Sequence, residues 1–210
     1  DMASLNPCDK VERPKTFSPT PRGLSGADVQ RLLSVIPETG PGLRDRAIVL
    51  TLVLTGRRRT EVLSMKAGNL SREDGKVYYR YRGKGGKTGT REIPEPAYQA
   101  IRRSLAAWGK ALESMAPQES LWPGTRTEGI SGGTFYGRLQ RYLRHAGLPP
   151  AGVHIFRHTA AKLRRDAGAS VEEVSRFLDH SNLAVTTVYL QRLEGHEDPL
   201  WATVARNLGL

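Results

Sequence analysis

The stretch of the chain that most constrains its fold is residues 47–54, in which seven apolar side chains surround a single threonine. A helix built from this stretch is apolar on every side, so it has to be enclosed by other elements instead of lying on the surface. Gly56 follows, and glycine is the residue that most often ends a helix. We therefore predict a central buried helix over residues 43–54, with the rest of the fold packed around it.

Shorter amphipathic patterns predict further helices around this one. Ser25 and Asp28 are typical of a helix start, and apolar side chains then recur at helical spacing as far as Ile36. Pro96 suits a first helical turn, and Ser170 with Glu173 forms a capping-box pattern. The remaining predicted helices span, in chain order, residues 96–114, 131–146, 154–167, 170–178, 185–190 and 199–208.

One segment alternates as a strand does. Val77, Tyr79 and Tyr81 alternate with Tyr78 and two arginines, which predicts a half-buried strand with a basic outer face. A glycine-rich turn over residues 83–89 follows, and residues 90–93 return as a second strand. The predicted fold class is mainly α with a small antiparallel β-sheet (α+β).

The charge of the chain points to a polyanionic partner. Its 210 residues contain 32 Lys and Arg against 21 Asp and Glu, a formal net charge of +11. Nucleic acid is the first candidate for a chain this basic, although a basic surface can also serve solubility alone. The arginines and lysines are clustered, and we predict as DNA contacts Arg57, Arg59, Arg80, Arg82, Lys87, Arg91, Arg138 and Arg141.

Other features narrow the class of protein. Cys8 is the single cysteine, which excludes a disulfide within the chain and a cysteine-based zinc site, and we expect neither a metal nor a cofactor. No apolar run approaches the length of a membrane span, and the start shows no signal-peptide pattern. We expect a soluble cytoplasmic protein associated with DNA. Residues 1–22 are rich in proline and poor in apolar side chains, which predicts a linker.

A set of polar residues can attack a phosphodiester without a metal. The negative charge that builds on the phosphate needs donors that stay charged, and Arg58 and Arg157 are the candidates. Tyr189 is the candidate nucleophile, and its phenol needs a base because its ordinary pKa is about 10. His154 fits that role, one turn before Arg157, so the two are expected to share a helix face.

Two further residues complete the set. Lys84 lies in the glycine-rich turn and can protonate the leaving 5′ oxygen, and His180 can donate a hydrogen bond to a phosphate oxygen. Taken singly, each residue has an ordinary structural reading: a tyrosine in the core, a histidine in a structural hydrogen bond, a lysine in a plain hairpin. The functional interpretation depends on their occurring together.

In this order the residues resemble the tyrosine recombinase family of phage integrases, Xer and Cre proteins. The run Thr55-Gly56-Arg57-Arg58-Arg59-Thr60-Glu61 resembles the box that holds the family's first catalytic arginine, with Glu61 as its supporting acid. The turn from Gly83 to Lys87 resembles the hairpin of the catalytic lysine. The runs from His154 to His158, from Phe177 to Ser181 and from Thr186 to Tyr189 resemble the remaining boxes.

The resemblance implies the family's catalytic-domain fold and site-specific DNA recombination through a 3′-phosphotyrosyl bond. The catalytic residues that it implies are Arg58, Lys84, His154, Arg157, His180 and Tyr189. Two positions depart visibly from the family pattern, since Arg57 stands where leucine is usual and Asp179 where glycine is usual. Asp179 is expected either to raise the pKa of His180 or to engage a partner. Thr60 in place of serine is a milder change.

The resemblance also implies a domain organisation and partners. Residues 23–195 correspond to the catalytic domain, and the family's N-terminal core-binding domain is expected to be absent from this chain. Residues 196–210 form a C-terminal helix that docks on a neighbouring protomer or packs on its own domain. The expected partners are double-stranded DNA and further copies of the protein in a tetrameric synapse, with no membrane. The alternatives are a type IB topoisomerase and a DNA-binding protein with a degenerate pocket.

Overall fold

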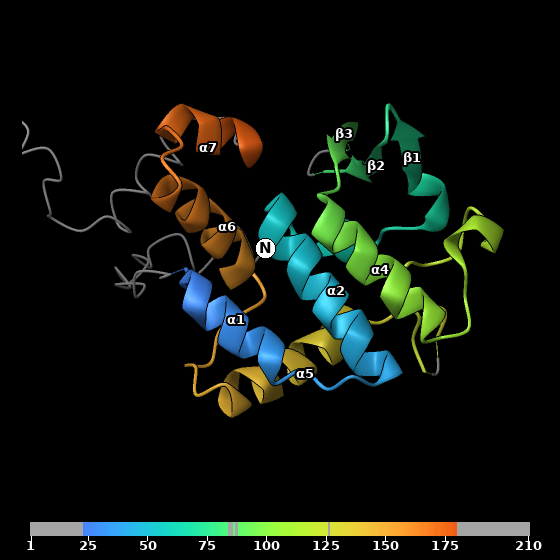
Figure 1. The fold of residues 1–210 in the computed structure, drawn as a ribbon, viewed down its shortest axis with the longest axis horizontal. Helices are drawn as coiled ribbons and strands as arrows, with labels where there is room; N and C mark the ends of the chain where they lie inside the picture. The colour runs from blue at the N-terminus through green and yellow to red at the C-terminus, as the bar shows by residue number, and fades with distance from the viewer. Residues whose placement is uncertain (1–22, 84–85, 87, 126, 180–210) are drawn as a thin grey trace, which may run out of the picture.

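Helix α2 (Gly40–Thr55) runs through the middle of the structure, between α4 (Glu95–Ala106) and α6 (Ile155–Asp166) (Figure 1). The structure is a computed structural model that describes residues 23–83, 86, 88–125 and 127–179. Ile48 and Val49 are fully buried and Leu52 is 1% exposed, so the helix is enclosed by its neighbours. The predicted central helix is confirmed, and it begins three residues earlier because Thr39 caps it, accepting a hydrogen bond from the Gly42 amide at 3.3 Å.

Gly56 ends α2 in the left-handed conformation, with φ at +63°. A Cβ atom at this position would lie 2.4 Å from the Phe177 ring, so the position also lacks room for a side chain. Helix α7 (Val171–Phe177) thus packs directly on the C-terminal end of α2. The sequence signal at Gly56 therefore marks both a helix stop and a close contact between segments far apart in the chain.

The other predicted caps are also confirmed. Ser25 and Asp28 form the capping box of α1 (Gly26–Ser34), and Ser170 and Glu173 form that of α7. Ser131 caps α5 (Gly132–His145) by accepting a hydrogen bond from the Thr134 amide at 3.1 Å. Helices α1 and α5 lie side by side at the end of the fold opposite the sheet (Figure 1).

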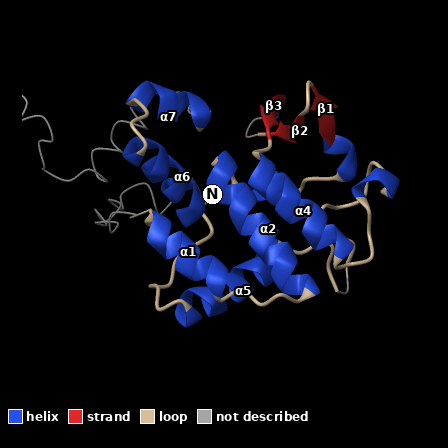
Figure 2. Cartoon of the chain, in the orientation of Figure 1, coloured by secondary structure: helices blue, strands red, loops and turns tan. Residues whose placement is uncertain are grey.

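The sheet has three antiparallel strands in the order β1-β2-β3 and lies at one edge of the helical body (Figure 2). In β2 (Lys76–Arg82), Val77 and Tyr79 point into the core, while Arg80 and Arg82 are exposed. The predicted alternation and the α+β class are thus confirmed. Strand β3 (Thr88–Glu92) begins two residues before the predicted strand. Strand β1 (Leu70–Glu73) was not predicted, because only its pairing with β2 makes it a strand.

Two further differences have local causes. Helix α4 ends at Ala106 instead of residue 114, because Gly109 turns the chain at φ +67° and the Trp108 indole donates to the Gly40 carbonyl at 3.0 Å. Helix α3 (Arg59–Leu63) is too short to show an amphipathic pattern. Two 3-10 turns, Ala67–Asn69 and Leu112–Ser114, complete the described elements.

Three predicted segments lie outside the described residues: the linker over residues 1–22 and the helices over 185–190 and 199–208. Within the described ranges, the structure contains no helix that is both long enough and apolar enough to cross a membrane.

We predict that Leu52→Ala lowers the free energy of unfolding by about 2–5 kcal/mol, because it leaves a cavity in the enclosed face of α2. Leu50→Ala on the same helix is the matched control, since Leu50 is only partly buried and the change in helix propensity is identical. Urea denaturation measures both variants. Equal losses would contradict the enclosed position of Leu52.

Candidate active site

The buried carboxylate of Glu61 holds the Arg58 side chain in place. It precedes α3, and Glu61 in the first turn of that helix accepts hydrogen bonds from the Arg58 amide at 3.0 Å and from its Nη1 at 2.9 Å. The Glu61 side chain is 2% exposed, whereas that of Arg58 is 36% exposed. One carboxylate therefore fixes both the backbone and the guanidinium of Arg58 while leaving the outer edge of the guanidinium open to a ligand.

Arg157 lies in the first turn of α6 and is 4% exposed. Its Nη1 donates to the Gly56 carbonyl at 2.8 Å and its Nη2 to the Leu178 carbonyl at 2.5 Å. Gly56 and Leu178 are the C-terminal caps of α2 and α7. Carbonyls at helix C-termini carry partial negative charge, so two helix ends stabilise the guanidinium and orient it.

His154 stands just before α6 and faces a pocket that also exposes Arg58. The pocket has a volume of about 400 Å³ and is lined by Arg58, Arg59, Thr60, Tyr136, Gly152, Val153 and His154. His154 is exposed while Arg157 is buried, and the charge of Arg157 acts on the His154 ring. Their shared helix face stays a prediction. His154 precedes the helix, and its carbonyl accepts a hydrogen bond from the Arg157 amide at 3.0 Å.

The electrostatics of the site favour an anion. Burial lowers the pKa of Arg157 to about 10, and the neighbouring charges of Arg58 and Arg57 add to this effect. Partial desolvation, followed by the charges of Arg157 and Arg58, also lowers the pKa of the accessible His154. At neutral pH, Arg157 therefore stays charged and His154 is neutral. A bound phosphate would offset the repulsion between the guanidinium groups.

Arg57 does not reach the surface, so its prediction as a DNA contact is wrong. The side chain is 1% exposed and bonds to the Asp179 carboxylate and the Phe177 carbonyl. Its guanidinium also lies over the Tyr81 ring, 5.1 Å from the centroid. Asp179 was expected to engage a partner, and the partners that the structure shows are side chains of the same chain. The effect expected on His180 lies outside the described residues.

The other predicted DNA contacts divide by exposure. Arg138 donates to Asp45 and to the Tyr142 hydroxyl and leaves 26% of its side chain exposed, so its DNA contact stays a prediction. Arg91 bonds to Asp179 and remains 46% exposed. Four further members of the set are also exposed at the surface, namely Arg59, Arg80, Arg82 and Arg141.

Four site residues predicted from the sequence lie outside the described residues, namely Lys84, Lys87, His180 and Tyr189. Their positions stay predictions. The structure brings together Arg58, Glu61, His154 and Arg157, which come from two segments about a hundred residues apart in the chain. Within the described ranges, no group of three His, Cys, Asp or Glu side chains could hold a metal ion.

Three residues at or near this site were not among the predicted site residues. Tyr136 on α5 lines the pocket and is 45% exposed, a position without any motif to mark it. His158 stacks edge-on against His154 with ring centroids 4.8 Å apart. Tyr81 was predicted only as a residue on the inward face of a strand, yet its hydroxyl donates to Asp179. Its place at the end of β2, next to the glycine-rich turn, was the available signal.

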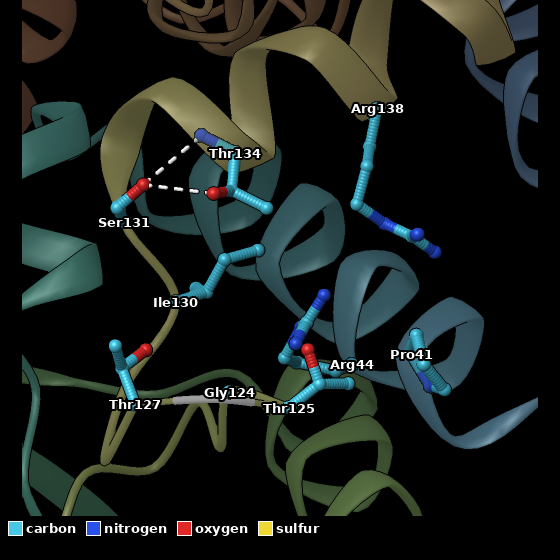
Figure 3. A pocket seen from close by; sticks show the side chains of 9 residues that line it. All are labelled: Pro41, Arg44, Gly124, Thr125, Thr127, Ile130, Ser131, Thr134 and Arg138. Atoms are coloured by element: carbon cyan, nitrogen blue, oxygen red, sulfur yellow. Dashed lines mark hydrogen bonds between the residues drawn. The ribbon is translucent and has the colours of Figure 1, made fainter.

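A second pocket of about 490 Å³ lies at the N-terminal ends of α2 and α5 (Figure 3). Arg44 and Arg138 line it, but both donate to the buried carboxylate of Asp45, which offsets their charge. Arg58 follows the other end of the 16-residue α2, about 20 Å away. The second pocket therefore gathers none of the residues of the candidate active site.

Residues 22–196 match the phage integrase family. The chain belongs to this family. Phage integrase relatives include the tyrosine recombinase XerD of Pseudomonas putida, 31% identical over 94% of this chain and 69% of that protein. The tyrosine recombinase XerA of Thermococcus kodakarensis is 32% identical over 86% of this chain and 62% of that protein. The chain thus spans about two thirds of the length of these relatives.

Solved phage integrase structures share the fold. The XerH site-specific recombinase bound to its difH substrate superposes with a TM-score of 0.69 at 20% identity, over 93% of this chain and 56% of that one. The XerA recombinase superposes with a TM-score of 0.68 at 22% identity, over 94% of this chain and 67% of that one. These likenesses confirm the predicted catalytic-domain fold.

We predict that the protein loses stability as the pH falls below about 6.5, in part through His158. Burial lowers the pKa of His158 to about 4, and the charges of His154 and Arg157 contribute. Between these two pKa values the histidine is protonated in the unfolded chain but neutral in the folded protein, so a lower pH favours unfolding. Urea denaturation from pH 7.5 to 4.5 should show a weaker pH dependence for His158→Gln. His145→Gln, at the exposed end of α5, should retain the wild-type slope; a wild-type slope in both variants would contradict this role of His158.

Proposed function

We propose that this chain catalyses site-specific cleavage and rejoining of DNA strands. This is the reaction for which its tyrosine recombinase relatives are named. The observation that carries the proposal is a pocket in which Arg58 and His154 meet, with the charged Arg157 adjoining it. The charge of Arg58 is paired with that of Glu61, whereas Arg157 donates to two carbonyls, which carry no net charge. The site therefore retains net positive charge for a phosphodiester.

The described residues support distinct roles in the cleavage step. Arg58 and Arg157 stabilise the charge that builds on the non-bridging oxygens, in a setting where neither has to reorganise. His154 is neutral at pH 7 because its pKa is lowered, so it can take a proton from the attacking hydroxyl. Glu61 has an indirect role, since it holds Arg58 in position through two hydrogen bonds.

In the proposed reaction the Tyr189 oxygen attacks the phosphorus and the bond to the 5′ oxygen breaks. The phenol proton passes to His154, and Lys84 gives a proton to the leaving 5′ oxygen. A 3′-phosphotyrosyl bond remains, which a 5′-hydroxyl of a second duplex attacks in the reverse sense. His180 donates to a phosphate oxygen. Since the number of phosphoester bonds is unchanged, the step requires no external energy source.

Double-stranded DNA is the proposed partner. Exposed arginines can contact its backbone: Arg80 and Arg82 on the outer face of β2, Arg59 at the start of α3 and Arg141 on α5. We further propose that residues 23–195 act as the catalytic domain and that copies of the protein assemble as a tetramer on DNA. Among the solved relatives, XerH is bound to its difH substrate and the Tn1549 transposon integrase is in complex with circular intermediate DNA.

We predict that the protein forms a covalent adduct with a nicked DNA substrate from which the cleaved strand diffuses away, and that Tyr189→Phe abolishes it. Denaturing electrophoresis detects the adduct. Tyr78→Phe, on the half-exposed face of β2, is the matched control and should retain the adduct. An adduct in Tyr189→Phe would remove that residue from the nucleophile role. DNA binding by the wild type without any adduct would instead identify a DNA-binding protein, and relaxation of supercoils lacking a recombination site would identify a topoisomerase.

We predict that Arg58→Lys and Arg157→Lys each slow adduct formation about 100-fold or more, because lysine loses the two-pronged hydrogen bonding of arginine to the transition state. DNA affinity should fall by less than about tenfold, since one phosphate contact among many contributes little to binding. Lysine keeps a positive charge beside Glu61 at position 58 and beside the two helix-end carbonyls at position 157, which protects folding. Arg144→Lys on the exposed face of α5 is the control. Equal losses in cleavage rate and affinity would contradict the catalytic role.

A further inference from the structure

The Asp179 carboxylate is a junction between three segments of the chain. It accepts hydrogen bonds from the side chains of Arg57, Tyr81 and Arg91. Arg57 follows the C-terminal cap of α2, whereas Tyr81 and Arg91 lie on the two paired strands β2 and β3. One carboxylate therefore ties the end of α2 and both strands of the hairpin to the segment that leads into residue 180.

Arg57 depends on this carboxylate. It is fully enclosed, and a guanidinium removed from water is costly unless an opposite charge and hydrogen-bond acceptors replace the water. The acceptors are the Phe177 carbonyl and, at 3.3 Å, the Thr55 carbonyl, and Asp179 supplies the opposite charge. Partial burial works against the charge on Asp179, but the hydrogen bonds from Tyr81 and Arg57 outweigh it and hold the pKa of the carboxyl below its usual value.

The backbone of Asp179 is unfavourable without these contacts. Its φ is +52°, in the left-handed region that glycine adopts far more readily than a residue with a side chain. A helix C-terminus often ends in this conformation, so the turn itself is ordinary and the aspartate in it is unusual. The contacts of the side chain have to offset the strain of the backbone.

The position of the pair links it to catalysis. Arg157 donates to the carbonyls of Gly56 and Leu178, and each carbonyl belongs to the residue directly before a member of the pair. The same two chain segments are therefore joined twice. Their backbone carbonyls accept hydrogen bonds from Arg157, and their side chains form the ion pair between Arg57 and Asp179. If the ion pair loosens, the spacing of the two carbonyls is free to change, and with it the direction of the guanidinium.

We propose that Arg57 and Asp179 form a positioning pair that holds Arg157 and the β2–β3 hairpin in the geometry of the cleavage step. The proposal rests on the proposed function. It also relates the two larger departures of the sequence from the family pattern, Arg57 and Asp179, because each is the partner of the other. A leucine at 57 with a glycine at 179 is the neutral arrangement: it leaves no buried charge unpaired and suits the left-handed backbone.

The test is a double-mutant cycle of Arg57→Leu, Asp179→Gly and the variant with both changes. Single-turnover adduct formation on nicked DNA, DNA affinity and urea unfolding are measured for each. Each single change should slow adduct formation about 100-fold at nearly constant affinity, because the Arg157 guanidinium is displaced. The double variant should react faster than either single variant, since it contains neither unpaired charge, but more slowly than the wild type, since Tyr81 has lost its acceptor at position 179. Rate losses that simply multiply in the double variant would overturn the pair.

A milder comparison applies if a single variant fails to fold. Tyr81→Phe removes one hydroxyl donor from Asp179, and Tyr142→Phe removes one, at 2.8 Å, from Asp45, a carboxylate that is likewise bonded to two arginines. Tyr81→Phe should slow adduct formation by about tenfold or more, whereas Tyr142→Phe should reduce only stability. Equal adduct rates in the two variants would reduce the Asp179 junction to a structural contact and overturn the proposal.

These outcomes are distinct from a failure of the proposed function. Wild-type protein that forms no adduct would overturn the function itself. An active wild type whose Asp179→Gly variant cleaves equally fast would overturn the positioning pair alone.

Discussion

The buried guanidinium of Arg157 joins three helices of this structure at one point. It reaches from α6 to the carbonyl at the end of α2 and to the carbonyl at the end of α7. Because helix ends rather than a carboxylate satisfy it, its positive charge is fixed in place without being neutralised. The same two hydrogen bonds therefore stabilise the fold and leave a charge available at the candidate active site.

The rest of the site follows from the rigidity of α2. Most of that helix is enclosed by its neighbours, so the residues directly after Gly56 leave the core at a fixed point. Glu61 then orients Arg58 from within the fold, and the pocket opens between this segment and the start of α6. Repulsion among the arginines lowers stability in the absence of an anion, a cost that is typical of sites organised to bind one.

What the sequence could predict depended on whether the signal was local. The buried helix, the caps at Ser25 and Ser170 and the alternation in β2 are each encoded within a few residues, and the structure confirms them. Strand β1 depends on its pairing with β2, and the end of α4 depends in part on the contact between Trp108 and Gly40, so neither was predicted from local patterns. Arg57 shows the same limit at the site. In sequence it belongs to a basic run, and only the fold reveals that its partner lies 122 residues away.

The burial of Arg57 also explains how an extra arginine can be tolerated beside Arg58 and Arg157. Alone it would add to the repulsion that already lowers the pKa of Arg157, and it would carry an unpaired charge into the core. Asp179 cancels that charge locally, so the two residues together are as neutral as an apolar residue and a glycine would be. Unlike an apolar contact, however, a charged hydrogen bond has a preferred direction. The ion pair therefore sets the relative orientation of two segments around Arg157, in addition to holding them together.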